Sequence, residues 1–334
     1  MTKGPLAVAV IEGGPSAEAA VSRSSAEGVA RALASVGHRV RKLTLGPGLA
    51  TELAGAPVDV VFPVVHGTFG EDGCLQGLLE IAGLAYVGSG VLASALAADK
   101  IAAKVAFRAA GLPVAEDAVV LRGEDLARAA ARVRQTLGPQ VVVKPHAQGS
   151  AIGVTRVEAD APDEVLERAI ELALSFDERA LCERFVVGRE VTCGVLDAST
   201  LGVSRALPPT EIMAKLGDFY DFRSRYGTGG SGHVCPAQLG AEVVAEVQRV
   251  AFAAHRALGC CDLSRADFVV GDGDDRARVT LLEVNTLPGM TPTSLYPEAA
   301  GVGGVAMDAL CDGLVRAALR RGARRTNDAV PLPE

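Results

Sequence analysis

The sequence predicts an α/β fold that begins with a small doubly wound unit and continues into α+β pieces. Strands and helices alternate through the N-terminal third, which favours a parallel sheet covered by helices. The strand expected at Val58–Val65 is apolar on both faces, as such covered strands are. At 334 residues the chain is also too long for one ordinary core, which predicts roughly two domains.

The N-terminal elements follow from apolar runs and the glycines that end them. An apolar run at Leu6–Ile11 predicts the first strand, which a Gly-Gly turn closes. A second strand is expected near Arg39–Leu43. Helical periodicity predicts three helices, each followed by a glycine, at Ala19–Val36, Leu75–Ala82 and Ala93–Ala110.

The rest of the chain mixes helices with strands differently. A polar, glycine-rich stretch, 215–232, has few apolar residues and is predicted to be a mobile lid. The predicted helices are Asp125–Leu137, Asp163–Phe176 and Ala241–Leu258, and the predicted strands are Gln140–Lys144, Ala180–Glu183, Asp262–Val270 and Val279–Val284.

Composition argues against several classes of protein. The net charge is −7 and the basic cluster from Arg316 to Arg325 reads as a solvated helix end, so a nucleic-acid partner is not expected. No apolar run approaches the roughly 18 residues of a membrane span, and the first strand is too short for a signal peptide. We therefore expect a cytoplasmic protein without a membrane partner.

Cysteine usage fits a reducing compartment. There are seven cysteines, an odd number, and none forms a CxxC pair, so no structural zinc is expected. Five of them stand in apolar surroundings and are predicted to be buried free thiols: Cys74, Cys182, Cys193, Cys260 and Cys311.

The strongest chemical signal lies in the last two predicted strands. Alternation along a strand places Arg265 and Asp267 on one face, and likewise Glu283 and Asn285. Two carboxylates and an amide oxygen suit Mg²⁺ with phosphate ligands, and the arginine could hold a developing phosphoryl charge. A surface salt bridge at a sheet edge is the other interpretation. The turn after Asn285, which brings the backbone N–H of Gly289, favours a functional site.

Lys144 ends an apolar strand immediately before a glycine- and serine-containing loop that includes Ser150. Backbone amides and one charge in this arrangement fit a phosphate cradle, although a plain surface turn would look similar. The order of a Walker A loop is missing, as is a GxGxxG after the first strand. Glu18, His66, Glu183 and Glu190 follow or end strands, but each alone could be an ordinary structural or solvated residue.

Taken together, the motifs resemble those of D-alanine–D-alanine ligases in the ATP-grasp superfamily. The resemblance runs along nearly the whole chain, and its motifs are long and in the same order. They are GGPSAE at 13–18, HGTFGEDG at 66–73, GLAYVGSGVLASALAADK at 83–100, VVKPHAQGSAIGV at 142–154, RADF at 265–268 and LEVNTLPGMTPTSL at 282–295.

The resemblance implies a three-domain ATP-grasp fold with ATP between the second and third domains. The implied domains are 1–98, 99–186 and 187–325, followed by a tail, 326–334. The positions that match nucleotide-binding residues are Lys100, Lys144, Ser150, Glu183, Glu190, Arg225 and Glu283, and those that match the ligands of Mg²⁺ or Mn²⁺, with two ions expected, are Asp267, Glu283 and Asn285.

The resemblance also implies how the amino acids are held. Glu18 matches the residue that binds the ammonium of the first D-alanine, and Ser150 and Tyr226 match its hydrogen-bonded partners. The remaining matched residues are His66, near the first substrate's carboxylate; Arg265 and Gly289, which stabilise the transition state; and Ser294 and Leu295, which bind the second carboxylate.

The implied reaction has two steps and serves peptidoglycan precursor synthesis. The first D-alanine carboxylate attacks the γ-phosphate of ATP, and the amine of the second D-alanine then displaces phosphate from the acyl phosphate. A carboxylate is a poor electrophile, so activation by phosphate behind a lid that excludes water makes physical sense. A homodimer is also a family expectation.

Three departures leave alternatives open. Ala151 stands where relatives commonly have a second serine, Phe222 where a tyrosine is usual, and Arg225 where a lysine is usual. A sister ligase that uses D-serine or D-lactate as second substrate, or a self-resistance copy, is therefore the nearest alternative. Tyr226 counts against D-lactate. A catalytically silent nucleotide-binding protein and a carboxylase-type relative are weaker alternatives.

Overall fold

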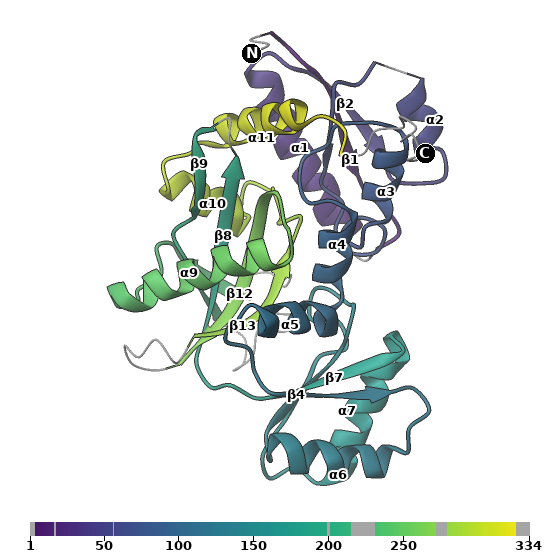
Figure 1. Ribbon diagram of the computed structural model, residues 1–334, viewed down its shortest axis with the longest axis vertical. Coiled ribbons are helices and arrows are strands. Elements are labelled where there is room, and N and C mark those ends of the chain that lie inside the picture. The colour runs from purple at the N-terminus through teal and green to yellow at the C-terminus, as the bar shows by residue number, and fades with distance from the viewer. Residues whose placement is uncertain are drawn as a thin grey trace, which may run out of the picture.

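The N-terminal part of the chain forms a three-stranded parallel sheet in the order β2-β1-β3, as the computed structural model shows (Figure 1). The structure describes residues 4–16, 18–55, 57–198, 201–214, 231–271 and 279–324. The strands are β1 (Ala7–Glu12), β2 (Arg39–Thr44) and β3 (Val60–Pro63), and the helices around them are α1 (Ala19–Ser35), α2 (Leu49–Ala54), α3 (Cys74–Ile81) and α4 (Val91–Ala98).

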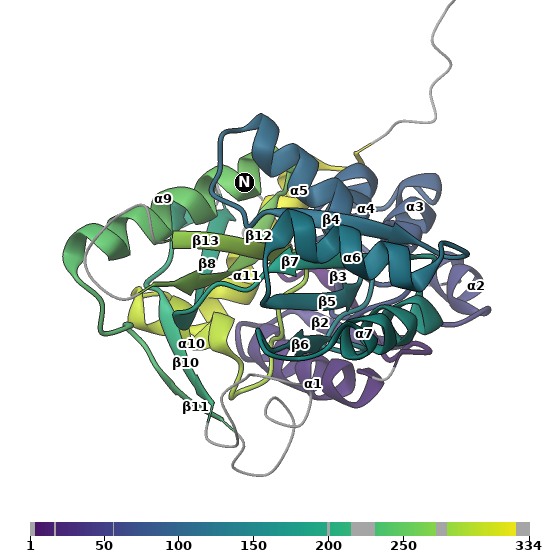
Figure 2. The same cartoon turned by 90° about the horizontal axis from the view of Figure 1, so that it is seen from below.

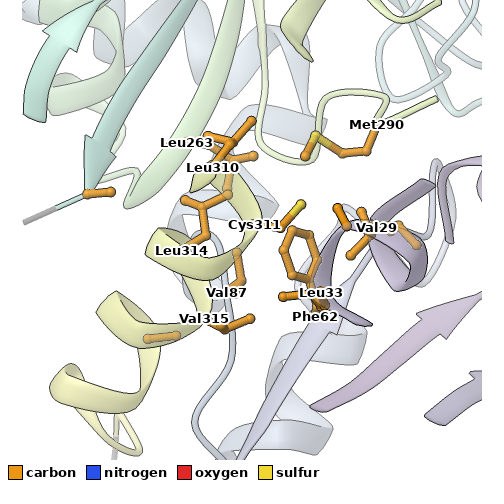
Figure 3. Packing of buried hydrophobic residues seen from close by; sticks show 14 of the residues in the cluster. Val29, Leu33, Phe62, Val87, Leu263, Met290, Leu310, Cys311, Leu314 and Val315 are labelled. Carbon is orange, nitrogen blue, oxygen red and sulfur yellow. The ribbon is translucent and has the colours of Figure 1, made fainter. Parts of the chain in front are cut away.

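Strands β1 and β3 of this sheet are buried on both faces, as their apolar sequences predict, whereas β2 at the edge is mostly exposed. Val8 and Val10 of β1 pack into one hydrophobic cluster, and Ala9 and Ile11 pack into another on the opposite face. The first cluster also contains Leu314 of α11 (Met307–Arg321), so the end of the chain returns to cover the N-terminal sheet (Figure 3). The doubly wound N-terminal unit is thereby confirmed.

The middle of the chain is a four-stranded antiparallel sheet in the order β4-β7-β5-β6. Helices α6 and α7 pack against it together, below the rest of the molecule in Figure 1. The bounds are β4 (Asp117–Leu121), α6 (Leu126–Leu137), β5 (Val141–Pro145), β6 (Thr155–Val157), α7 (Asp163–Phe176) and β7 (Arg179–Arg184).

The third sheet follows the order β11-β10-β8-β12-β13, with β9 paired to β8. Figure 2 shows the middle sheet and this sheet side by side, and in Figure 1 helix α5 lies below α4 and above the middle sheet. The bounds are α5 (Lys100–Ala109), β8 (Arg189–Ala198), β9 (Val203–Ala206), β10 (Thr210–Ala214), β11 (Ser231–Val234), α9 (Ala241–Ala257), β12 (Asp262–Val270), β13 (Val279–Asn285) and α10 (Leu295–Val302). The division at residues 98, 186 and 325 stays a prediction.

The predicted helix Ala93–Ala110 is wrong as a single element. It is two helices, α4 and α5, that meet at Asp99. The Asp99 backbone is extended there, and its carboxylate accepts from the backbone N–H groups of Ile101 and Ala102. An aspartate is a strong N-cap, so it starts a new helix instead of continuing the old one.

Two further expectations need correction. Cys74 is exposed at the start of α3, whereas the other four thiols predicted to be buried are buried. The C-terminal arginines are not simply solvated, because Arg321 makes two hydrogen bonds of 2.7 and 2.9 Å to the buried Asp262 carboxylate. Arg324 donates to the Gly88 carbonyl. These arginines join α11 and the loop after it to the other parts of the fold.

Candidate functional site

Strands β12 and β13 present the polar residues that their alternation predicts. In the antiparallel register, Arg265 lies opposite Asn285 and Asp267 lies opposite Glu283, with an irregularity immediately after Asp267. Ala266, between the two polar residues of β12, is fully buried. The polar side chains therefore share one face of the sheet, and the opposite face packs on the core.

Asp267 is held at the centre of this face by three neighbours. Arg265 donates two hydrogen bonds of 2.8 Å to its two carboxylate oxygens. Thr192 of β8 donates at 2.8 Å, and the Asn285 amide donates at 3.2 Å. Burial alone would lower the pKa of Arg265, but Asp267 outweighs it and raises that pKa above its ordinary value. The guanidinium is therefore a permanent charge on this face.

The three predicted metal ligands offer two carboxylates and one amide, all oxygen donors of the kind that Mg²⁺ takes. Asp267 and Asn285 are already joined by a hydrogen bond, and Glu283 is cross-strand from Asp267. Across the described ranges, no group of three or more His, Cys, Asp or Glu side chains converges as a metal site by itself. The donor set thus fits a hard cation that brings further oxygen ligands with it, such as phosphate.

A pocket between the second and third sheets brings together six of the residues predicted to bind nucleotide. The seventh, Arg225, lies outside the described residues, as does Tyr226. Those in the pocket are Lys100, Lys144, Ser150, Glu183, Glu190 and Glu283.

Within this pocket the lysines are paired with glutamates. Lys144 forms an ion pair with Glu183, and Lys100 lies 3.2 Å from Glu283. Lys100 also donates at 2.7 Å to the Gln148 carbonyl, which ties α5 to the loop after β5. Burial opposes the charge on Lys144, yet Glu183 raises its pKa above the ordinary value. The pocket therefore holds charged ammonium groups suited to phosphates.

The loop that follows β5 is strained where it meets the N-terminal domain. Ser150 and Ala151 have φ values of 52° and 55°, a region that residues other than glycine seldom occupy. In this conformation the Ser150 hydroxyl donates to the Glu18 carboxylate, from 132 residues earlier in the chain. A Cβ atom on Gly149 would lie 3.4 Å from the same carboxylate. The loop and Glu18 are thus in close contact.

A second pocket continues from the first toward the N-terminal domain. The two share Lys100, Gln148, Gly149 and Glu283, and the second adds the loop from Gly67 to Asp72. His66, at the start of that loop, is buried, and its Nε2 atom has no hydrogen-bond partner among the residues that the structure describes. Burial lowers the pKa of His66, so the ring is neutral near neutral pH.

The turn after β13 begins at Thr286, which lines the second pocket. Gly289 lies so near Ser294 that a Cβ atom on the glycine would be 2.8 Å from the serine hydroxyl. Ser294 is the N-cap of α10, and Leu295 is its first residue. Free backbone N–H groups at a helix N-terminus are suited to an anion such as a carboxylate.

Two residues with strong electrostatic roles were not predicted from the sequence. Glu71 receives a 2.7 Å hydrogen bond from the Gly67 N–H, and burial, reinforced by Glu18, raises the pKa of Glu71 to about 8. Lys104 is buried and pairs with Glu183. Glu71 stands in the motif HGTFGEDG, which could have drawn attention to it, whereas Lys104 had no local signal beyond its place in a helix.

Comparisons with known proteins agree with this geometry. Residues 42–89 match the family model for the D-ala D-ala ligase N-terminus, and residues 106–316 match the model for its C-terminus. The D-alanine–D-alanine ligase of Parvibaculum lavamentivorans is 46% identical over 314 residues, which cover 93% of this chain and 97% of the relative. That of Citrifermentans bemidjiense is 44% identical over 311 residues, covering 93% and 95%.

Solved structures show the same likeness in three dimensions. The D-alanine–D-alanine ligase of Bacillus anthracis complexed with ATP has a TM-score of 0.79 at 28% identity and covers 94% of this chain and 98% of its own. The ligase of Coxiella burnetii has a TM-score of 0.80 at 25% identity, with 95% and 94% covered. In the described part of the chain, none of the helices is both long and apolar enough to span a bilayer.

Proposed function

The chain belongs to the D-alanine–D-alanine ligase family, and we propose that it uses ATP to join two D-alanine molecules. The product would be D-alanyl-D-alanine, for peptidoglycan precursors made in the cytoplasm. The observation that carries the proposal is the continuity of the two pockets at Lys100 and Glu283, which lets a nucleotide's phosphates meet an amino acid.

In the first step, a carboxylate oxygen of the first D-alanine attacks the γ-phosphorus of ATP and ADP leaves. We assign nucleotide binding to the six pocket residues and to Arg225. Lys100 and Lys144 offset phosphate charge, and Glu18, fixed by Ser150, holds the substrate's ammonium. Asp267, Glu283 and Asn285 would hold Mg²⁺ or Mn²⁺, which would neutralise phosphate oxygens.

In the second step, the amine of the second D-alanine attacks the carbonyl of the D-alanyl phosphate and phosphate leaves, forming the amide bond. Charge develops on the carbonyl oxygen, and Arg265 with the Gly289 N–H would stabilise it. Ser294 and the N-terminus of α10 at Leu295 would bind the second carboxylate, with neutral His66 beside the first. Tyr226 is assigned to the Glu18–Ser150 network.

The first test is magnesium-dependent ADP release with D-alanine alone, with the product identified by mass. We expect robust turnover and D-alanyl-D-alanine. The assay is repeated with D-serine, D-lactate or L-alanine added. A mixed product with no turnover on D-alanine alone would overturn the assignment in favour of a sister ligase. Sedimentation analysis would test the homodimer that we also expect.

A further inference from the structure

Lys104 is a buried charge beside the nucleotide pocket, although it does not line that pocket. It lies in α5, and its residue is only 1% exposed. Its ammonium lies 2.9 Å from the Asp117 carboxylate and also pairs with Glu183, 79 residues further along the chain. A lysine buried this completely is found in proteins when it is paired, and Lys104 has two carboxylates.

The Glu183 carboxylate is divided between two lysines. Its Oε1 atom accepts from Lys104, and its Oε2 atom pairs with Lys144. Burial alone would raise the pKa of Glu183, but the charges of Lys144 and Lys104 outweigh it, so the pKa is lowered below its ordinary value. Glu183 is therefore ionised because of these two cations.

The two lysines differ in what else they can reach. Lys144 lines the nucleotide pocket together with the loop residues Gln148 to Ala151, where phosphates are expected. When phosphate draws the Lys144 ammonium, Glu183 loses part of its neutralising charge. A buried carboxylate left without a cation is strongly destabilised. Lys104 is enclosed behind the pocket and remains with Glu183.

We propose that Lys104 is a positioning residue for nucleotide binding, which keeps Glu183 paired and in place while Lys144 turns to the phosphates of ATP. This inference rests on the proposed function for the identity of the nucleotide. Lys104 itself would contact neither ATP nor D-alanine. Its effect should appear in ATP affinity and much less in the chemical steps or in D-alanine binding.

The chain offers a matched control one turn along the same helix. Arg108 pairs with the same Asp117 carboxylate, but within the described ranges it forms no other ion pair, and its side chain is 44% exposed. We expect Lys104→Met to raise KM for ATP about tenfold or more, with kcat changed less than about threefold and KM for D-alanine unchanged. Arg108→Met should change KM for ATP less than about twofold, and Lys104→Arg should recover part of the loss.

A double-mutant cycle separates positioning from a general structural role. In a Glu183→Gln background there is no carboxylate charge to neutralise, so Lys104→Met should then change ATP affinity by less than about twofold. Affinity is measured by calorimetry with a non-hydrolysable ATP analogue and Mg²⁺, which needs no turnover. Equal losses in both backgrounds, or equal effects of Lys104→Met and Arg108→Met, would overturn the inference.

If Lys104→Met fails to fold, Lys104→Gln completes the same cycle, with Lys104→Arg as the variant that keeps the charge. The proposed function fails separately. Wild-type protein that binds the analogue but makes no dipeptide from D-alanine would contradict the ligase assignment and leave the Lys104 cycle interpretable. Turnover with no coupling between residues 104 and 183 would contradict only the role of Lys104.

Discussion

Each of the two joined pockets contains a glutamate, buried in the case of Glu183 and half-buried in the case of Glu71, and the two differ in charge. On the nucleotide side, Glu183 stands between two lysines, and its pKa is lowered. On the amino-acid side, burial raises the pKa of Glu71 to about 8, and Glu18 adds to that effect. Burial acts in the same direction on both, so the charges nearby decide which one is ionised.

This difference matches the ligands proposed for each side. A triphosphate carries several negative charges and needs a fixed arrangement of cations, which Glu183 orients. An amino acid has one charge of each sign. On that side Glu18 can hold the ammonium, while a protonated Glu71 adds no second negative charge near the substrate's carboxylate. The largest expected effect on activity concerns the Arg265 guanidinium, on the polar face of β12.

Replacing Arg265 should have the largest effect on activity. Arg265→Met removes the charge proposed to stabilise the transferring and tetrahedral groups, and it leaves Asp267 without two hydrogen bonds. We expect kcat to fall by about a thousandfold. Steady-state ADP release measures this loss, and calorimetry with an ATP analogue serves as the control. If Arg265→Met keeps a tenth of the wild-type kcat, Arg265 is not the main group that stabilises the transition state, and another cation must do so.

Replacing Glu71 should have a smaller effect, visible in the pH dependence. As pH rises through about 8, Glu71 ionises and repels the substrate's carboxylate, so KM for D-alanine should rise by about tenfold between pH 6.5 and 9. In Glu71→Gln the side chain stays neutral, and this rise should be absent. The comparison requires KM for D-alanine at several pH values in both proteins.

The same variant tests stability. The native pKa of Glu71 is raised above its ordinary value of 4.5, so the native state holds this proton more tightly than the unfolded chain. The stabilisation is fully present below about pH 4.5 and is lost as pH rises through about 8. Glu71→Gln should remove this part of the pH dependence. If Glu71→Gln and wild type show the same dependence of unfolding free energy on pH, Glu71 is ionised in the native protein, as Glu183 is.

The parts of the site that sequence predicted depend on local periodicity or on long motifs. Arg265 and Asp267 were placed on one face because side chains alternate along any strand, and the structure has them so. The break at Asp99 is missing from the sequence prediction because apolar periodicity continues on both sides of it. Apolar periodicity alone does not show where one helix ends and the next one begins.

The charges that distinguish the two sides could not be predicted in this way. Lys104 and Glu183 are 79 residues apart, and Glu18 and Ser150 are 132 apart, so only the folded chain brings each pair together. A buried lysine in an amphipathic helix looks like a solvated one until its neighbours are known. The predicted lid, 215–232, lies mostly outside the described residues, and its role remains a prediction.

A third buried group, away from both pockets, tests whether burial dominates where no close ion pair forms. His255 of α9 is fully buried, with Nδ1 2.8 Å from the Ser264 hydroxyl and Nε2 3.8 Å from Asp197. Burial lowers its pKa from 6.5 to about 4, although Asp197 opposes the change. The more distant carboxylate does not compensate here, unlike the lysines at Glu183.

The expected effect is on stability alone. Between pH 6.5 and about 4 the unfolded chain binds a proton at His255 that the native protein does not, so the free energy of unfolding falls as pH falls. The loss should be at most about 3 kcal/mol. Urea unfolding at pH 7 and pH 4.5 should show a smaller loss in His255→Gln than in wild type, with equal ligase activity at pH 7. Equal losses in the two proteins would mean that His255 is protonated in the fold, and that Asp197 neutralises it as the lysines neutralise Glu183.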